Sequence, residues 1–169
     1  CGLTVPRQDG AGERQQSEQP LYELMEQVTS FYQQELERQP DAKRYLNEQR
    51  GLSAAVIQAF RLGYAPSGWG GLLKQFDESK QAALIKSGMV IKRDELDCYD
   101  RFRRRVMFPI RDRRGHVVAF GGRILGDGTP KYLNSPETPI FHKSSELYGL
   151  YELLQRRGKV KGIMVVEGY

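Results

Sequence analysis

The spacing of apolar side chains in the first half of the chain predicts helices. Between residues 20 and 40, seven apolar side chains recur three or four positions apart, and a proline stands at each end of the run. That interval places them on one face of a helix, and proline is well tolerated at a helix start. Further short helices are predicted in segments 41–50, 53–60, 67–76 and 79–88.

A different pattern begins near residue 89. Short segments rich in β-branched and aromatic residues replace the helical spacing, and charged or glycine-containing turns separate them. The pair 104–112 and 116–124 predicts a β-hairpin with Gly115 in its turn. Shorter strands are predicted in segments 89–92, 96–100 and 131–135.

The end of the chain predicts a helix over 145–158 and then an apolar strand over 162–168, bounded by glycines. A short, fully apolar strand of this kind is typical of a sheet that is covered on both faces. We therefore expect an α+β fold. It has a helical N-terminal subdomain and a small antiparallel sheet, and it leads into the first strand of an α/β subdomain.

Residues 7–19 are polar, contain glycine and carry almost no apolar side chains. This composition is typical of a flexible linker, so we expect another domain to precede it. The chain as a whole, with 169 residues, can hold one domain or two small ones.

Cations are concentrated in the second half of the chain. Residues 1–98 hold 12 Lys/Arg and 14 Asp/Glu, a net charge of −2, whereas residues 99–161 hold 14 and 6, a net charge of +8. Such a one-sided distribution favours a polyanionic partner. The alternative is a chance excess of charge on a solvated face.

Arg101, Arg103 and Arg105 alternate with other residues at the start of the predicted hairpin. On a strand they would share one face and present a row of guanidinium groups, which bind phosphate bidentately. Three apolar residues would then anchor the opposite face in the core: Val106, Phe108 and Ile110. The alternative is an exposed edge strand that its charge keeps soluble.

Two further segments suit contact with a polyanion. In Phe120–Arg123, two glycines allow a ligand backbone to approach Arg123, or simply allow a bend. Segment 129–149 is stiffened by three prolines, and Tyr132 within it can stack on a base or pack against the hairpin. The polar donors of this segment are Lys131, Tyr132, Asn134, Ser135, Thr138, His142 and Lys143.

Glu167 stands at the C-terminal end of the last predicted strand, where α/β folds place their sites. A centre for metal-dependent phosphoryl transfer needs more than one carboxylate, and none follows Glu167 before Tyr169. Considered alone, Glu167 is a strand-end residue.

Composition limits the remaining classes. No run of about 18 apolar residues occurs, and the N-terminus lacks a secretory signal, so no membrane segment is predicted. Cys1 and Cys98 have no metal-ligand spacing, which favours free thiols in a reducing compartment.

Segment 101–152, followed by "VVEGY", closely resembles the catalytic core of bacterial replicative DNA primases of the DnaG type. The segments "LYELMEQVTSFYQQEL" and "YLNEQRGLSAAVIQAFRLGYAP" resemble the helical part of that core. The resemblance runs from about residue 20 to residue 169. Its specificity lies in the ordered combination of "RVMFPI", "FGGR", "KYLNSPET" and "VVEGY".

The resemblance implies synthesis of short RNA primers on a single-stranded DNA template from ribonucleoside triphosphates. It implies that residues 1–19 are a linker behind a zinc-binding domain, 20–143 an N-terminal basic subdomain and 144–169 the start of a TOPRIM subdomain. The implied partners are the template, the nucleotides, the RNA primer and, through a further C-terminal domain, the replicative helicase. A membrane is not among them, and the implied location is the bacterial cytoplasm.

The same resemblance assigns roles to single residues. Glu167 matches the first TOPRIM acid, which implies a catalytic role and a bond to Mg²⁺ or Mn²⁺. The later acids would lie beyond residue 169, so we expect the chain alone to be inactive; zinc would belong to the upstream domain. Residues matching the template groove are Arg50, Arg101, Arg103 and Arg123. Residues matching the nucleotide site are Lys131, Tyr132, Asn134 and Lys143.

Three other functions are compatible with the residues. The first is a non-catalytic module that binds single-stranded nucleic acid through the arginines and Tyr132. The second is another TOPRIM enzyme, a topoisomerase or a nuclease. The third is a purely structural interaction domain, against which the net charge of residues 99–161 counts.

Overall fold

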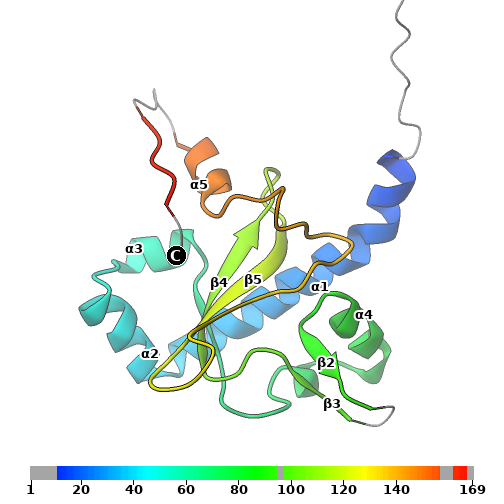
Figure 1. The fold of residues 1–169 in the computed structure, drawn as a ribbon, viewed down its shortest axis with the longest axis horizontal. Coiled ribbons are helices and arrows are strands. Elements are labelled where there is room, and N and C mark those ends of the chain that lie inside the picture. The colour runs from blue at the N-terminus through cyan, green and yellow to red at the C-terminus, as the bar shows by residue number, and fades with distance from the viewer. Residues whose placement is uncertain (1–10, 95–96, 157–161, 167–169) are drawn as a thin grey trace, which may run out of the picture.

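The computed structural model of this chain describes residues 11–94, 97–156 and 162–166. A four-stranded antiparallel sheet forms its centre, and the long helix α1 (Ala11–Glu37) crosses behind it (Figure 1). The sheet has the order β1-β4-β5-β6. Its strands are β1 (Gly63–Ala65), β4 (Arg105–Arg111), β5 (Val117–Ile124) and β6 (Tyr132–Asn134).

The remaining elements surround this sheet. A helical group follows α1, and a small two-stranded sheet of β2 and β3 lies beside α4 (Figure 1). The helices are α2 (Pro40–Arg44), the π-helix η1 (Tyr45–Gln49), α3 (Ala54–Ala59), the 3-10 turns η2 (Leu73–Gln75) and η3 (Glu78–Lys80), α4 (Gln81–Lys86) and α5 (Leu150–Leu154). The second sheet consists of β2 (Val90–Lys92) and β3 (Cys98–Asp100).

Helix α1 buries the apolar face that its spacing predicted, with Met25 and Val28 fully enclosed. It begins at Ala11 and carries Pro20 inside it, so the expected start at Pro20 was wrong. The backbone of residues 11–19 is helical rather than an irregular linker; residues 1–10 lie outside the described part. A proline within the first three turns costs one helical hydrogen bond, which the packed remainder of a 27-residue helix can offset.

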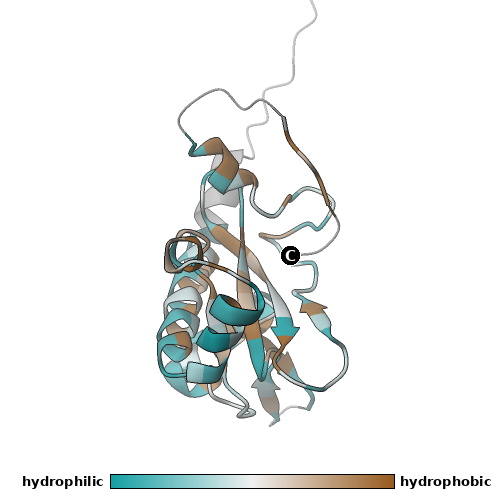
Figure 2. Ribbon diagram, turned by 90° about the vertical axis from the view of Figure 1, so that its left-hand side faces the viewer, coloured by the Kyte–Doolittle hydropathy of each residue, from teal (hydrophilic) through white to brown (hydrophobic). Residues whose placement is uncertain are grey.

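The contact between α1 and the sheet depends on the absence of a side chain at Gly63. A Cβ atom there would lie 2.6 Å from the Cβ of Tyr32 and 2.7 Å from its carbonyl carbon. The Tyr32 ring in turn meets Phe120 of β5 edge to face, with ring centres 5.4 Å apart. The first six residues of β4 are all buried, including the predicted anchors Val106 and Phe108. Figure 2 shows that the strands contain many hydrophobic residues and lie between the helices on one side and the loops on the other.

Several local predictions are confirmed. The Ser53 hydroxyl oxygen caps α3 by accepting a hydrogen bond from the Val56 N–H at 3.3 Å. Segment 41–50 is helical, as α2 followed by η1. Strands β4 and β5 form the expected hairpin, and Gly115 has a φ of 95° in its turn, a value that favours glycine.

Three predicted elements were wrong in length or kind. Segment 67–76 forms only the three-residue turn η2, and of the helix expected over 145–158 the described residues, up to 156, form only α5. Gly149 precedes α5 with a φ of 82°, and this left-handed conformation interrupts the helical path.

The apolar strand expected at the end is also absent from residues 162–166, which pair with no strand among the described residues. Val165 is 68% exposed, and Figure 2 shows this segment as hydrophobic and separate from the sheet. A parallel strand obtains its burial from neighbouring strands and helices, which the described residues do not supply. No helix in the described part is long and apolar enough to span a bilayer.

Candidate nucleic-acid interface

The expected row of guanidinium groups on one strand face does not form. Strand β4 begins only at Arg105, and residues 101–104 belong to no strand. Arg104 has a φ of 53°, so the backbone turns before it enters β4. Alternation across a pleat therefore does not govern these arginines, and each takes its own direction.

Arg101, Arg103 and Arg105 all donate to main-chain carbonyl groups of this chain, and Arg103 does so to that of Asp100. Arg101 Nε donates to the Gly88 carbonyl at 2.7 Å. The buried Arg105 donates to the carbonyls of Pro130 at 2.8 Å and of Gly122 and Lys131 at 3.3 Å. Burial lowers the pKa of the Arg101 and Arg105 guanidinium groups. Arg105 is therefore a structural cation, whereas the groove role predicted for Arg101 stays a prediction.

Besides its bond to the Asp100 carbonyl, Arg103 lies against two aromatic rings, the exposed Trp69 and the half-buried Tyr99. Its guanidinium carbon lies 4.0 Å from the centre of the Trp69 ring and 5.2 Å from that of Tyr99. Trp69, the one tryptophan in the sequence, is 66% exposed. We call Trp69, Tyr99 and Arg103 the Trp69 cluster. An exposed ring beside a cation suits stacking with a base next to a phosphate.

Asp100 fixes the loop that carries Trp69. Its carboxylate accepts hydrogen bonds from the backbone N–H groups of Leu72 at 2.7 Å and Leu73 at 3.0 Å, and its own N–H donates to the Trp69 carbonyl at 2.8 Å. Burial raises the pKa of this carboxyl group, although those hydrogen bonds and Arg103 act in the opposite direction. The exposed ring thus stands on a loop tied to β3.

A second cluster forms around Arg123 on β5. Its guanidinium carbon lies 4.7 Å from the centre of the Tyr45 ring and 5.9 Å from that of Tyr132. Tyr132 is the cross-strand partner of Arg123 on β6 and is 44% exposed. We call Tyr45, Arg123 and Tyr132 the Arg123 cluster.

Other predicted cations act on this second cluster. A hydrogen bond from Arg123 lowers the pKa of the Tyr132 phenol, and the charges of Arg123, Lys131 and Arg50 lower it further. Lys131 and Arg123 also line a hollow of about 640 Å³ together with Arg44. The structure therefore brings together Arg50, Arg123, Lys131 and Tyr132, which the sequence divided between template and nucleotide contacts.

Arg105 lies between the two clusters. It donates to the Lys131 carbonyl at 3.3 Å, and the charge of nearby Arg103 adds to the lowering of its pKa. The cationic surface thus consists of two ring-and-guanidinium clusters joined by a buried arginine, rather than one row.

The other two predicted nucleotide contacts lie on β6 and on the loop beyond it. Asn134 is exposed and pairs with Gly121, two positions along β6 from Tyr132 and therefore on the same face. The Lys143 N–H donates to Glu137 at 3.0 Å, and this bond, followed by the His142 interaction, lowers the pKa of Glu137. The Lys143 side chain is exposed on that loop, and its nucleotide role stays a prediction.

Of the two glycines in Phe120–Arg123, Gly122 is needed for packing inside the protein. A Cβ atom on Gly122 would lie 2.9 Å from the Phe102 ring and 3.0 Å from Arg105 Cδ. The space that Gly122 leaves open is therefore filled by side chains of this chain.

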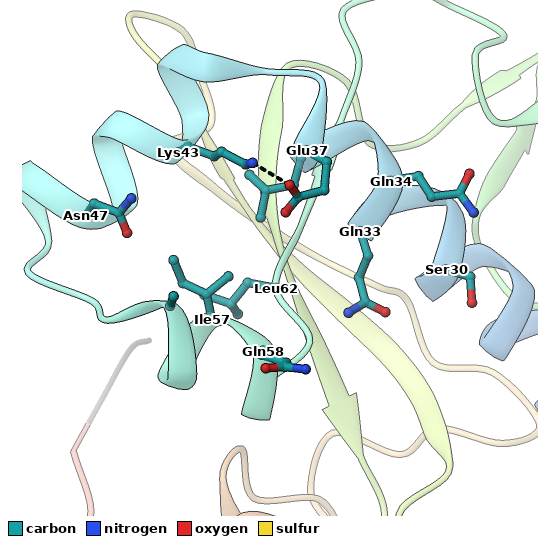
Figure 3. A pocket seen from close by; sticks show the side chains of 11 residues that line it. Ser30, Gln33, Gln34, Glu37, Lys43, Asn47, Ile57, Gln58 and Leu62 are labelled. Atoms are coloured by element: carbon teal, nitrogen blue, oxygen red, sulfur yellow. Dashed lines mark hydrogen bonds and ion pairs between the residues drawn. The ribbon is translucent and has the colours of Figure 1, made fainter.

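A different hollow, of about 710 Å³, lies between α1 and the group α2–α3 (Figure 3). Its rim carries amides such as Gln33, Gln34 and Asn47. Its lining includes one cation, Lys43, and that cation is bonded to Glu37. This hollow therefore lacks the unpaired positive charge that a polyanion requires.

Trp69 and Tyr45 were missed in the sequence. The flanking glycines of "SGWGG" were a usable signal, because a lone tryptophan between glycines has little local packing. Tyr45 gave no such signal, since its stacking on Arg123 joins residues 78 positions apart in the chain.

Within the described residues, no three His, Cys, Asp or Glu side chains converge to hold a metal ion. Glu167 lies outside the described residues. The described residues alone thus do not fit a Mg²⁺ or Mn²⁺ site, and no chemical step is routed through such an ion here.

Aromatic rings beside guanidinium groups, two of the rings exposed, are features of modules that bind single-stranded nucleic acid. The family model for the DNA primase catalytic core, N-terminal domain, matches residues 31–154. The chain therefore belongs to the family of DNA primase catalytic cores.

Relatives and solved structures agree with this assignment. The DNA primase of Escherichia coli (strain K12) is 51% identical over 175 residues, which cover 99% of this chain and 30% of that protein. The Pseudomonas aeruginosa DNA primase is 48% identical over 178 residues, covering 100% of this chain and 27% of that protein. The chain thus spans about a third of the length of these relatives or less.

Two solved structures share the fold and clear sequence identity. A DnaG primase catalytic domain bound to ssDNA has a TM-score of 0.82 and 52% identity, covering 94% of this chain and 51% of that one. A DNA primase domain from Pseudomonas aeruginosa has a TM-score of 0.80 and 51% identity, covering 89% and 48%. The α+β fold expected from the sequence is confirmed.

Proposed function

We propose that this chain is the template-binding part of a DNA primase, an enzyme that makes short RNA primers on single-stranded DNA during replication. The observation that carries the proposal is the stack of Arg103 on the exposed Trp69 ring, in a chain that belongs to the primase core family. A similar catalytic domain that has been solved with ssDNA supports it.

The two clusters suggest a division of contacts. Template bases stack on Trp69, while Arg103 pairs with the adjacent phosphate. The Arg123 cluster, with Arg50 and Lys131 nearby, supplies a second set of phosphate contacts. Lys131, Tyr132, Asn134 and Lys143 would meet the incoming ribonucleotide or the primer.

The reaction proposed for the whole enzyme is nucleotidyl transfer. The 3′ hydroxyl of the primer attacks the α-phosphate of a ribonucleoside triphosphate, a new phosphodiester bond forms and pyrophosphate leaves. The part of this chain is to hold template and nucleotide in line and to offset their charge, which is how phosphoryl transfer is chiefly catalysed. Glu167 is proposed as the first TOPRIM acid of a divalent-metal site whose other acids come from elsewhere in the enzyme.

The remaining assignments belong to the same proposal. Residues 1–19 would link to a zinc-binding domain, 20–143 form the basic subdomain and 144–169 begin the TOPRIM subdomain. The proposed partners are ribonucleoside triphosphates, the RNA primer and the replicative helicase in the primosome, and the proposed location is the cytoplasm.

Template binding is tested with the 169-residue chain and a fluorescein-labelled (dT)12 oligonucleotide. We expect the logarithm of the binding constant to fall linearly with the logarithm of salt concentration, by roughly 0.7 for each phosphate contact. A chain that leaves the oligonucleotide unbound even at low salt would remove the template role from both clusters.

The catalytic role is tested in the protein that carries this chain together with the further segments its relatives have. Glu167→Gln should abolish template-directed RNA synthesis but leave oligonucleotide binding at the native level. Undiminished synthesis would exclude Glu167 from the metal site. Loss of binding in the same variant would indicate misfolding instead.

A further inference from the structure

Arg123 is half-buried and lies against two aromatic rings. Its guanidinium group lies between two tyrosine rings, at 4.7 Å from Tyr45 and 5.9 Å from Tyr132, and its Nε atom is buried. A ligand can therefore reach only its terminal nitrogens, which also supply the hydrogen bond to Tyr132, and Arg123 lines the hollow with Arg44 and Lys131.

The two rings around Arg123 differ in how well they are fixed. Tyr132 is on the edge strand β6 and 44% exposed, whereas Tyr45 is 7% exposed. Tyr45 opens the π-helix η1 and packs in a core cluster with Leu46 and Val106. A ring held on several sides fixes the plane of the guanidinium group stacked on it, which an exposed ring does less well.

The contact uses the ring of Tyr45 rather than its hydroxyl group. That hydroxyl is buried and has no hydrogen-bond partner among the described residues. A buried polar atom without a partner costs roughly 1–3 kcal/mol. The useful property of this side chain is therefore its aromatic face under Arg123.

The charges around the hollow leave an excess for an anion. Arg44, Arg123 and Lys131 line it together with two acids, Asp41 and Asp127. Asp41 is paired with Arg44 at 3.4 Å. Arg123 and Lys131 then face a single remaining carboxylate.

We propose that Tyr45 is a positioning residue, whose ring orients Arg123 so that its terminal nitrogens bind a phosphate group in this hollow. The proposal rests on the polyanion-binding function proposed above and adds a residue to it. The phosphate can come from the DNA backbone or from the polyphosphate of a nucleotide, and the experiment separates these sources.

The experiment measures the salt dependence of (dT)12 binding by variants of the 169-residue chain. Arg123→Gln removes one phosphate contact and should weaken binding about 5- to 10-fold, with a slope shallower by about 0.7. Tyr45→Leu keeps a buried apolar side chain without the ring and should give the same loss. The double variant should lose no more than either single one, because both changes remove one contact. Tyr45→Phe, which restores the ring, should recover most of the lost affinity.

The matched control is Tyr64→Leu, which removes a ring from the same core cluster. It should lower the melting temperature without changing the salt slope. Should Tyr45→Leu fail to fold, Tyr45→Met fills a similar volume without a ring and replaces it. A native slope and affinity in the ring-less variant, or fully additive losses in the double variant, would overturn the role of Tyr45.

The source of the phosphate is decided by repeating the series with inorganic tripolyphosphate in a calorimeter. If the double variant loses no more DNA affinity than either single variant, Tyr45 and Arg123 are coupled in DNA binding, which supports a backbone phosphate. If this coupling appears only with tripolyphosphate, it supports the polyphosphate of a nucleotide. Wild-type affinity of Tyr45→Leu for both probes contradicts the proposal. A native chain that binds tripolyphosphate with this coupling but binds no DNA would remove the template function and leave the positioning role intact.

Discussion

The Arg103 guanidinium carbon lies 4.0 Å from the centre of the Trp69 ring, and Asp100 ties the loop that carries Trp69 to β3. The ring is largely exposed, yet its loop is fixed by hydrogen bonds to the carboxylate of the buried Asp100. This combination allows a base to stack without first ordering the protein, which lowers the entropic cost of binding.

Trp69→Ala should weaken (dT)12 binding by about 1–3 kcal/mol, the usual contribution of one base–aromatic stack. Because the side chain is 66% exposed, the free energy of unfolding should change by less than about 0.5 kcal/mol. Fluorescence anisotropy and urea unfolding measure the two effects. Trp69→Phe is the control and should keep part of the affinity; native affinity in Trp69→Ala would place the bases elsewhere.

Asp100→Asn should destabilise the fold. An amide side chain has one acceptor oxygen, so one of the two N–H groups of Leu72 and Leu73 is left without its partner, at a cost of about 1–3 kcal/mol. Urea unfolding at pH 7 measures this cost. An unchanged midpoint would show that the carboxylate is not needed to hold the Trp69 loop.

The titration of Asp100 makes a separate contribution to stability. Because its folded-state pKa is raised above 3.8, the folded chain binds the proton more tightly than the unfolded chain between these two values. The contribution of this group is therefore largest below pH 3.8 and falls as the pH rises through the folded-state pKa. A carboxyl carbon NMR titration should place its midpoint above that of a model aspartate; a midpoint at or below the model value would contradict the effect of burial.

Glu152→Gln should destabilise the attachment of α5. Glu152 forms an ion pair with Arg111, and the two side chains are only 16% and 10% exposed. Arg111 also donates to the Ala59 carbonyl and lies 4.7 Å from the Tyr151 ring centre, so its charge would remain buried without a counter-ion. We expect a loss of about 1–3 kcal/mol in urea unfolding, with the double change Arg111→Met/Glu152→Met less harmful than the single one.

The control for this ion pair is Glu35→Gln. Glu35 pairs with Arg38 at 2.8 Å, but the Arg38 side chain is 72% exposed. A pair of this kind contributes about 0–1 kcal/mol. Equal losses in the two variants would mean that the burial of the Arg111–Glu152 pair has no energetic consequence.

Gly63→Ala should loosen the contact between α1 and the sheet. The new methyl group would lie within 2.7 Å of the Tyr32 backbone, which cannot rotate away as a side chain can. Overpacking of this kind costs about 1–3 kcal/mol, visible as a lower melting temperature. Gly68→Ala, where no atom lies within 4 Å, is the matched control and should change little. A native melting temperature for Gly63→Ala would contradict the packing described here.

Much of the fold was predictable because local patterns determined it. The spacing of Leu21 to Leu36 predicted α1, and alternation with Gly115 in the turn predicted the β4–β5 hairpin. The start of α1 at Ala11 was not predictable, because a proline such as Pro20 usually indicates the start of a helix, and here the helix includes it.

The candidate site was predictable by residue type but not by geometry. Arg103 and Arg123 both lie beside aromatic rings, and Tyr132 was identified as a candidate, but the nearest ring of each arginine, Trp69 or Tyr45, was not. The reason is that both contacts join distant segments, and the loop of Trp69 obtains its conformation from Asp100, 31 positions away. The row of arginines failed because Arg104 turns the backbone, and a left-handed residue other than glycine leaves no mark in the sequence.

The enclosed position of Arg105 should make it less reactive toward chemical reagents than the arginine next to it. Its nitrogens are already bonded to the carbonyls of Gly122, Pro130 and Lys131, whereas Arg104 next to it is open to solvent. A dicarbonyl reagent selective for arginine should therefore modify Arg104 rapidly and reach Arg105 only after the sheet opens. Two adjacent and chemically identical side chains would then report separately on the surface and on the integrity of the fold.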